Sequence, residues 1–179
     1  MPQKFLIDNA GSMLAHWGQL KYVLETLLMK VNRIDENGVD LSFTLGGVNI
    51  ENAKTVDKVM ATLKDPTAQP KAGAYTDMVR SLRGLFDDYL RYAKGQTRIG
   101  HRLKKLTLLV LTDGIWENTV NKIYVDQTII SFAQNLEKIM GRDIADRPVS
   151  IEFIQFGNDE DATLRLKRLD DDLVIDSIP

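Results

Sequence analysis

Residues 106–114 read Leu-Thr-Leu-Leu-Val-Leu-Thr-Asp-Gly, a near-continuous apolar run that ends in an acid and a glycine. A run of this kind predicts a parallel β-strand whose two faces are both covered by helices. Residues 4–8, Lys-Phe-Leu-Ile-Asp, form a shorter run that also ends in an acid, and turn residues follow it before a long helical stretch. The chain therefore places a carboxylate at the end of a predicted buried strand twice.

Helical and strand-like patterns alternate through the rest of the chain. Helices are predicted at about residues 13–32, 52–63, 76–93, 121–140 and 160–169, further strands at 39–45, 48–50, 149–156 and 173–178, and long loops at 64–74 and 95–102. Gly46-Gly47 indicates a tight hairpin turn into a short antiparallel edge strand. We therefore predict a single α/β domain over residues 1–179, with a doubly wound, mostly parallel open sheet, Rossmann-like, and helices on both faces.

The composition argues against several classes of protein. The chain has 23 Lys and Arg against 25 Asp and Glu, which leaves a net charge of −2, and it has no cysteine. No overall basic field is present to attract nucleic acid, and no apolar run reaches the roughly 20 residues of a membrane-spanning helix. The lack of cysteine excludes disulfides and thiolate metal sites. We expect a cytoplasmic, intracellular protein that binds neither nucleic acid nor membranes.

The two strand-end acids, Asp8 and Asp113, are expected to face one crevice. Ligands of open α/β sheets bind outside the carboxyl ends of the strands, where the strand order reverses, and in the order 3-2-1-4-5-6 the first and fourth strands flank that point. Asp8 and Asp113 end the first and fourth predicted strands. Two adjacent carboxylates need a shared proton or a cation, and hard divalent cations favour oxygen ligands. A magnesium-like ion is the predicted occupant.

Residues 5–13, Phe-Leu-Ile-Asp-Asn-Ala-Gly-Ser-Met, resemble the Asp-x-Ser-x-Ser opening of the metal-ion-dependent adhesion site (MIDAS) of von Willebrand factor A-type (vWA) domains. Asp8 and Ser12 match the first acid and the second serine of that motif. Ala10 stands where the family has its first serine. The likeness extends over nearly the whole chain, and its segments are similar to those of a fungal subset of the family.

Two further segments resemble the remaining parts of the vWA metal site. Residues 73–77 are similar to the loop that carries the metal-binding threonine, here Thr76, and residues 111–114 are similar to the strand end with the second acid, here Asp113. The resemblance implies an interaction module in which Asp8, Ser12, Thr76 and Asp113 hold Mg²⁺ or Mn²⁺ and a partner protein presents an Asp or Glu to the ion. Because alanine offers no oxygen at position 10, we expect metal binding to be weak or absent.

Three aromatic residues beside these loops are candidate partner contacts. Trp17 and Trp116 follow the two strand-end loops, and Tyr75 precedes Thr76. Large aromatic side chains on an interaction face are frequent binding anchors, and ordinary core packing is the alternative for both tryptophans. Thr76 also has two possible roles, because a threonine at this position can bind a metal or cap the following helix.

A binding module, not an enzyme, is the expected function. A strand-end aspartate can act as a nucleophile beside Mg²⁺, which makes a magnesium-dependent phosphohydrolase the less favoured alternative. The strand end also resembles the opening of haloacid-dehalogenase-type enzymes, and that resemblance implies an acid where this chain has Ala10. The two histidines, His16 and His101, lie far apart and suggest no triad. A metal-free vWA scaffold that binds partners through its surface ranks second.

Overall fold

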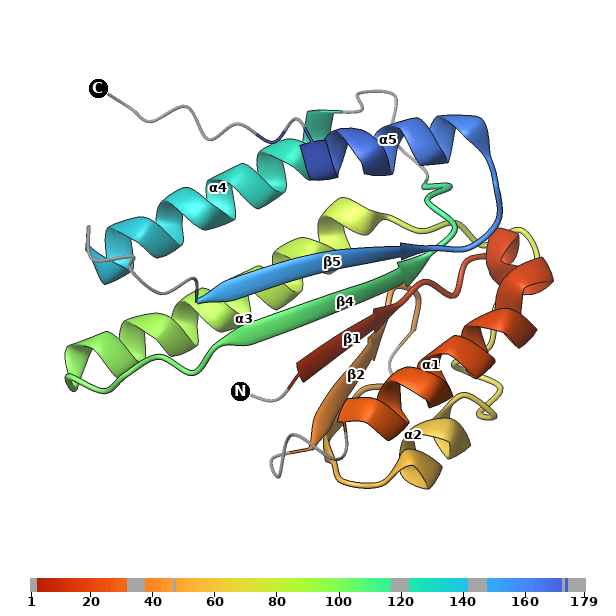
Figure 1. The fold of residues 1–179 in the computed structure, drawn as a ribbon, viewed down its shortest axis with the longest axis horizontal. Helices are drawn as coiled ribbons and strands as arrows, with labels where there is room; N and C mark the ends of the chain where they lie inside the picture. Colours follow the sequence, from red (N-terminus) through yellow and green to blue (C-terminus); the bar gives the residue numbers. More distant parts are fainter. Residues whose placement is uncertain are drawn as a thin grey trace.

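The computed structural model describes residues 3–31, 38–46, 48–116, 123–141, 148–171 and 173. Within these ranges five strands form one sheet in the order β3-β2-β1-β4-β5 (Figure 1). The strands are β1 (Gln3–Ile7), β2 (Val39–Phe43), β3 (Ile50–Ala53), β4 (Leu106–Thr112) and β5 (Val149–Gln155). All neighbouring pairs are parallel except β2 with β3. The predicted α/β fold, with its mostly parallel sheet and one antiparallel edge strand, is confirmed.

Helices cover both faces of this sheet. They are η1 (Gly11–His16, a 3-10 helix), α1 (Trp17–Val31), α2 (Val56–Thr62), α3 (Met78–Arg98), α4 (Ile123–Met140) and α5 (Glu160–Asp171). The helices α1 and α2 share one hydrophobic core with the sheet, and α3 and α4 share the other (Figure 1). None of the described helices is long and apolar enough to cross a membrane.

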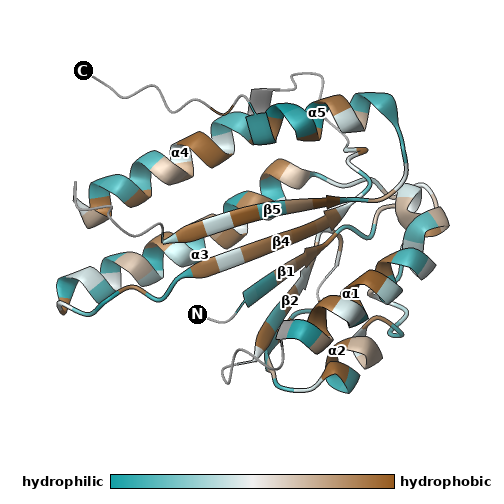
Figure 2. Cartoon of the chain, in the orientation of Figure 1, coloured by the Kyte–Doolittle hydropathy of each residue, from teal (hydrophilic) through white to brown (hydrophobic). Residues whose placement is uncertain are grey.

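The position of β4 between two layers of helices explains why the residues at its centre are all apolar. Leu108 and Val110 pack into the core under α3 and α4, whereas Leu109 and Leu111 pack into the core under α1 and α2. Successive residues of a strand point to opposite faces, so a strand with helices on both sides is apolar at most positions. The hydropathy colouring shows this as an almost continuous apolar strand in the middle of the fold (Figure 2).

The strand order reverses between β1 and β4, as the sequence predicts. These two strands are parallel neighbours, with Phe5 opposite Leu109 and Ile7 opposite Leu111. The pairing continues beyond the end of β1, because the Asp8 backbone N–H donates to the Leu111 carbonyl at 2.9 Å. The loops that follow β1 and β4 therefore leave the sheet side by side at its carboxyl edge, which is where ligands of such sheets bind.

The third helix is longer than predicted and starts later. It begins at Met78 because Asp77 is its N-cap, with the Asp77 carboxylate accepting a hydrogen bond from the Arg80 backbone N–H at 3.0 Å. It continues through Gly95, where we predicted a loop, because a glycine in an exposed helix costs only about 1 kcal/mol relative to alanine. The chain leaves the helix just before Gly100, which has a left-handed φ of 69°.

The edge strand and the second helix also lie later in the chain than predicted. The antiparallel strand occupies residues 50–53 instead of 48–50, so α2 begins at Val56, with Thr55 as its N-cap. The first predicted helix divides into η1 and α1. Gly47 of the predicted hairpin, the predicted helix positions 32, 121 and 122, and the predicted strand at 173–178 except for Leu173 lie outside the described residues.

Candidate metal centre

Asp8 is the centre of the candidate site and is completely buried at the end of β1. Its Oδ1 atom accepts a hydrogen bond from the Thr76 hydroxyl at 2.5 Å and one from the Ala10 backbone N–H at 3.1 Å. Its Oδ2 atom accepts a hydrogen bond from the Thr112 hydroxyl at 2.6 Å. Short hydrogen bonds to an ionised oxygen are the strong ones, so one carboxylate ties together three separate segments of the chain.

A third strand end joins this network through Thr44, which follows β2. The Thr44 hydroxyl lies 2.8 Å from the Thr76 hydroxyl and 3.4 Å from Asp8 Oδ1. The neighbouring Asn9 side chain donates to the Leu45 carbonyl at 2.7 Å and accepts from the Leu45 backbone N–H at 2.8 Å. These bonds fix the loop after β1 against the loop after β2, which holds the Asp8 carboxylate in one place.

A close backbone approach positions Thr76 beside Asp8. The Gly11 N–H donates to the Ala74 carbonyl at 2.8 Å, and a Cβ atom at Gly11 would lie only 2.9 Å from the Lys71 carbonyl oxygen. Only glycine fits there without a shift of the backbone. Because Asp77 is the N-cap of α3, the Thr76 hydroxyl is not needed as a cap and is directed to Asp8 instead.

The electrostatic environment of Asp8 favours a nearby positive charge. Burial raises the pKa of the Asp8 carboxyl above its ordinary value, and repulsion from the Asp113 carboxylate adds to the rise. The hydrogen bonds from Thr112, Thr76 and the Ala10 backbone lower this pKa but do not cancel the rise. A cation next to both carboxylates would remove the repulsion and offset the desolvation.

Two of the predicted ligand atoms are buried without a hydrogen-bond partner. Asp113 Oδ1 accepts from the Ile115 backbone N–H at 2.9 Å, but Asp113 Oδ2 has no partner, and neither does Ser12 Oγ. Leaving a buried polar group unsatisfied costs about 1–3 kcal/mol. In the part of the chain that the structure describes, only three other buried side-chain polar atoms share this condition. The loops after β1 and β4 thus each carry an oxygen that can accept a further interaction.

This donor set fits a hard divalent cation. Asp8, Ser12, Thr76 and Asp113 offer carboxylate and hydroxyl oxygens, the ligands that Mg²⁺ and Mn²⁺ prefer. Ala10 is buried and adds only a methyl group. Over the described ranges there is no cluster of three or more His, Cys, Asp or Glu residues that could hold a metal ion. A bound ion would therefore rely on two carboxylates, hydroxyls and water, and magnesium retains several waters readily.

Both tryptophans are buried, as expected for the core-packing alternative and not for exposed partner contacts. Trp17 is 7% exposed and packs in the core under α1, and Trp116 is 5% exposed. The Trp116 ring lies 6.1 Å from the Phe153 ring between centroids, and the Arg165 guanidinium lies 5.4 Å from the indole centroid. Tyr75, the third predicted contact, is 59% exposed.

Sequence reasoning missed Thr112 and Thr44 as parts of the site. Besides donating to Asp8, the Thr112 hydroxyl accepts from the Gly114 backbone N–H and from Trp116 Nε1, both at 2.9 Å. Their positions in the sequence could have identified them. Thr112 ends β4, which lies at the reversal of the strand order, and Thr44 follows β2, which lies next to β1. Thr112 connects the buried indole to the Asp8 carboxylate.

We expect Thr112→Val to lower the free energy of unfolding by about 2–3 kcal/mol more than Thr112→Ser does. Valine has nearly the same shape but removes the donor to Asp8 and leaves the Trp116 and Gly114 N–H groups without an acceptor. Serine keeps the hydroxyl and loses only a methyl group. Chemical denaturation of the two variants measures the difference, and equal losses would show that the hydroxyl network adds nothing to stability.

No family model matches this sequence, and none of the curated proteins compared with it is significantly similar. The chain's function must therefore be inferred from the residues at the carboxyl edge of its sheet.

Proposed function

We propose that this chain is a vWA-type protein-interaction module that binds an acidic side chain of a partner through Mg²⁺ or Mn²⁺ at the carboxyl edge of the sheet. The observation that carries the proposal is the pair of buried, unpartnered oxygens, Ser12 Oγ and Asp113 Oδ2, on the loops beside Asp8. Asp8, Ser12, Thr76 and Asp113 would hold the ion. Two carboxylates nearly neutralise it, and its open positions suit a carboxylate from a partner.

The surroundings of Asp8 favour binding over catalysis. A carboxylate nucleophile needs a free oxygen directed at its substrate, whereas both Asp8 oxygens accept short hydrogen bonds from threonine hydroxyls. Position 10, where the haloacid-dehalogenase-type opening has a second acid, holds a buried alanine whose N–H also donates to Asp8. These hydrogen bonds hold Asp8 in place and leave it without a free oxygen to attack a substrate. We therefore propose that the chain is not an enzyme.

A metal-free scaffold is the second candidate, and one observation favours it. The Asp8 carboxylate already accepts hydrogen bonds from Thr76, Thr112 and the Ala10 N–H, so its charge is partly compensated without any ion. In that case Ala10 marks a metal site that has lost its function, and partners bind to the surface alone. Measured affinity for divalent metal ions separates the two candidates.

We expect Ala10→Ser to tighten Mg²⁺ and Mn²⁺ binding by about tenfold or more, because it restores a neutral oxygen where the vWA motif has its first serine. The backbone at Ala10 is extended (φ −63°, ψ 166°), a conformation that serine adopts readily. Calorimetric titration of the wild type and the variant measures the change.

Ala93→Ser is the matched control, since Ala93 is also fully buried but lies on α3, in the core under that helix. It should leave the metal affinity unchanged. If Ala10→Ser and the wild type bind the ion equally, position 10 is not a ligand position. If neither binds any ion, the metal-free scaffold is the better description.

A further inference from the structure

Three exposed apolar side chains stand next to the proposed ligands. They are Leu14, Tyr75 and Ile115, with exposed fractions of 51%, 59% and 45%. Leu14 lies two residues after Ser12, Tyr75 directly precedes Thr76, and Ile115 lies two residues after Asp113. Each of the three segments that supply Ser12, Thr76 and Asp113 therefore also presents one apolar side chain to solvent. We call Leu14, Tyr75 and Ile115 the apolar rim.

Hydrogen bonds hold the loops of the apolar rim together at one edge of the sheet. The loop after β1, which leads to Leu14, is joined to the loop before α3 by the bond from Gly11 N–H to the Ala74 carbonyl, one residue before Tyr75. The strand that leads to Ile115 pairs with β1 up to Asp8. The three residues of the apolar rim therefore belong to segments that meet at the same edge of the sheet as Asp8 and Asp113.

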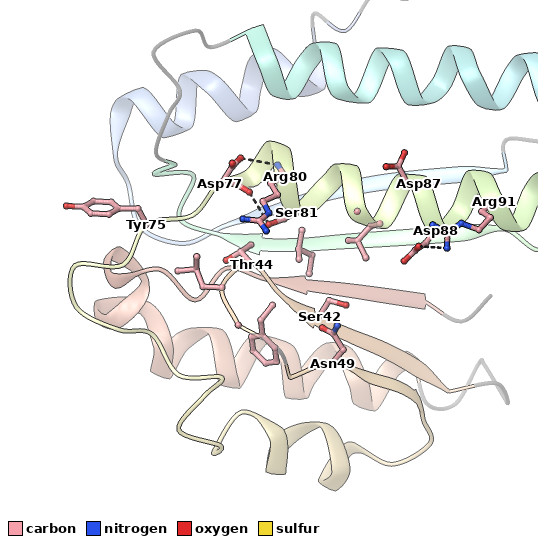
Figure 3. Close-up of a pocket in the computed structure, with 16 residues that line it drawn as sticks. Ser42, Thr44, Asn49, Tyr75, Asp77, Arg80, Ser81, Asp87, Asp88 and Arg91 are labelled. Carbon is pink, nitrogen blue, oxygen red and sulfur yellow. Dashed lines mark hydrogen bonds and ion pairs between the residues drawn. The ribbon is translucent and has the colours of Figure 1, made fainter.

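A polar groove begins at Tyr75, one of the three rim residues, and continues along α3. It has a volume of about 810 Å³ and runs between α3 and the strand β2, with Ser42, Thr44 and Ser81 among the residues that line it (Figure 3). Tyr75 projects outward at the end of the groove next to the site (Figure 3). The groove gives a bound chain a path away from the site that is lined with hydrogen-bonding groups.

Two basic side chains, Lys71 and Arg80, lie near Tyr75 together with Asp77, whose carboxylate caps α3, and farther along the groove Asp87 and Asp88 lie beside Arg91. Lys71 lies on the loop before α3, and Arg80 lies in the first turn of α3 and lines the groove (Figure 3). Their positive charge would complement an acidic side chain that approaches the ion, and such charges mainly increase the rate of association and its specificity. Apolar side chains around a charged centre match a ligand that combines one acid with apolar neighbours.

We propose that the apolar rim selects an extended segment of a partner protein in which an Asp or Glu is flanked by apolar residues. The inference rests on the proposed function, because the acidic residue is the one that reaches the metal ion. The flanking side chains cover Leu14, Tyr75 and Ile115, and the rest of the segment follows the groove along α3. The apolar rim thus takes the role for which sequence reasoning proposed the two tryptophans, and it sets specificity where the ion alone would accept any carboxylate.

The test compares two triple variants that remove similar side chains from different places. The rim variant combines Leu14→Ser, Tyr75→Ser and Ile115→Ser. The control variant combines Met29→Ser, Tyr22→Ser and Ile99→Ser, whose side chains are 56%, 71% and 60% exposed on α1 and just beyond the end of α3. All six side chains are exposed, so both variants should keep the thermal stability of the wild type.

The probe is an array of short peptides with a fixed central Asp and randomised flanking positions, read in Mg²⁺ and in EDTA. The wild type and the control variant should select peptides with apolar residues beside the Asp. The rim variant should lose at least about tenfold affinity for the selected peptides, yet still require Mg²⁺ and the central Asp. The same variants made together with Ala10→Ser raise the signal if the wild-type metal site is weak.

Other results of this experiment would contradict either the proposed function or the inference about the apolar rim. If peptides bind equally in EDTA and with Asn in place of the central Asp, or if no peptide binds, the proposed function fails and this inference falls with it. If binding needs Mg²⁺ and Asp but the flanks show no apolar preference, or the rim variant matches the control, only the inference about the apolar rim is wrong. Binding to anionic phosphatidylserine vesicles in place of peptides would also overturn it.

Discussion

Replacing Trp116 with alanine is expected to lower the free energy of unfolding by about 3–5 kcal/mol, the range for removing a buried large aromatic side chain. The ring is 5% exposed and is enclosed by Phe153 on β5 and Arg165 on α5. Its Nε1 atom donates to Thr112, so the substitution also removes a hydrogen bond to the residue that holds Asp8. Chemical denaturation and thermal melts measure the loss.

Trp116→Phe is the control for this prediction. Phenylalanine keeps most of the contacts with Phe153 and Arg165 but cannot donate to Thr112, so it should cost far less, about 1–2 kcal/mol. An exposed binding anchor would behave differently, because its removal would leave the melt unchanged and weaken partner binding. A Trp116→Ala protein that melts like the wild type would therefore contradict the burial of the ring.

The two central strands could be predicted from sequence almost to the residue. The pattern at residues 4–8 and 106–113 places the strand ends one residue beyond those of β1 and β4. This succeeds because a strand covered on both faces is mostly apolar, and a run of apolar residues can be recognised from the local sequence alone. The edge strand β3 was misplaced because its position depends on pairing with β2, which shifts register between Val39 and Leu41. An irregular pairing at the edge of a sheet does not produce a regular alternation of polar and apolar residues in the sequence.

The parts of the candidate site that depend on strand order could be predicted from the sequence. The parts that depend on how helices pack over the loops could not. The strand order alone brings Asp8 and Asp113 together, and a single loop contact then brings Thr76 to Asp8. The burial of Trp116 depends on how α5 packs over the loop after β4, and no residue near Trp116 in the sequence reports that packing. The roles of Asp8, Ser12, Thr76 and Asp113 as metal ligands stay a prediction.

Asp8→Asn is expected to have opposite effects on metal binding and on stability. Metal affinity should fall by about two orders of magnitude or more, because one of only two carboxylate ligands becomes neutral. Without metal, the variant should be more stable than the wild type at neutral pH, since it no longer buries a negative charge beside Asp113. Asparagine has almost the same shape and keeps an oxygen for the hydrogen bonds from Thr76 and Ala10. The Thr112 hydroxyl, which already accepts from Gly114 and Trp116, loses its acceptor, so the variant gains stability only because removal of the buried charge outweighs the loss of that one bond.

The pH dependence of this stability difference follows from the raised pKa of Asp8. Between the ordinary pKa of an aspartate and the raised pKa in the folded protein, the folded state keeps a proton that the unfolded state has lost. The wild type therefore loses stability as the pH rises through the folded pKa, and above it the penalty is fully present. The advantage of Asp8→Asn should be largest at neutral pH and shrink as the pH falls.

Chemical denaturation in EDTA, from acidic to neutral pH, measures the difference in stability between Asp8→Asn and the wild type. The control is Asp170→Asn, an exposed substitution on α5, whose stability relative to the wild type should not change with pH in this way. Saturating Mg²⁺ should reverse the order at neutral pH, because the ion stabilises only the protein that binds it. A wild type that gains no stability from Mg²⁺ or Mn²⁺, together with an Asp8→Asn variant that is more stable at neutral pH, would favour the metal-free scaffold. Asp8→Asn could instead prove less stable than the wild type in EDTA at neutral pH. In that case the hydrogen bonds from Thr76, Thr112 and Ala10 outweigh the cost of burying the charge, and the site is stable without a cation.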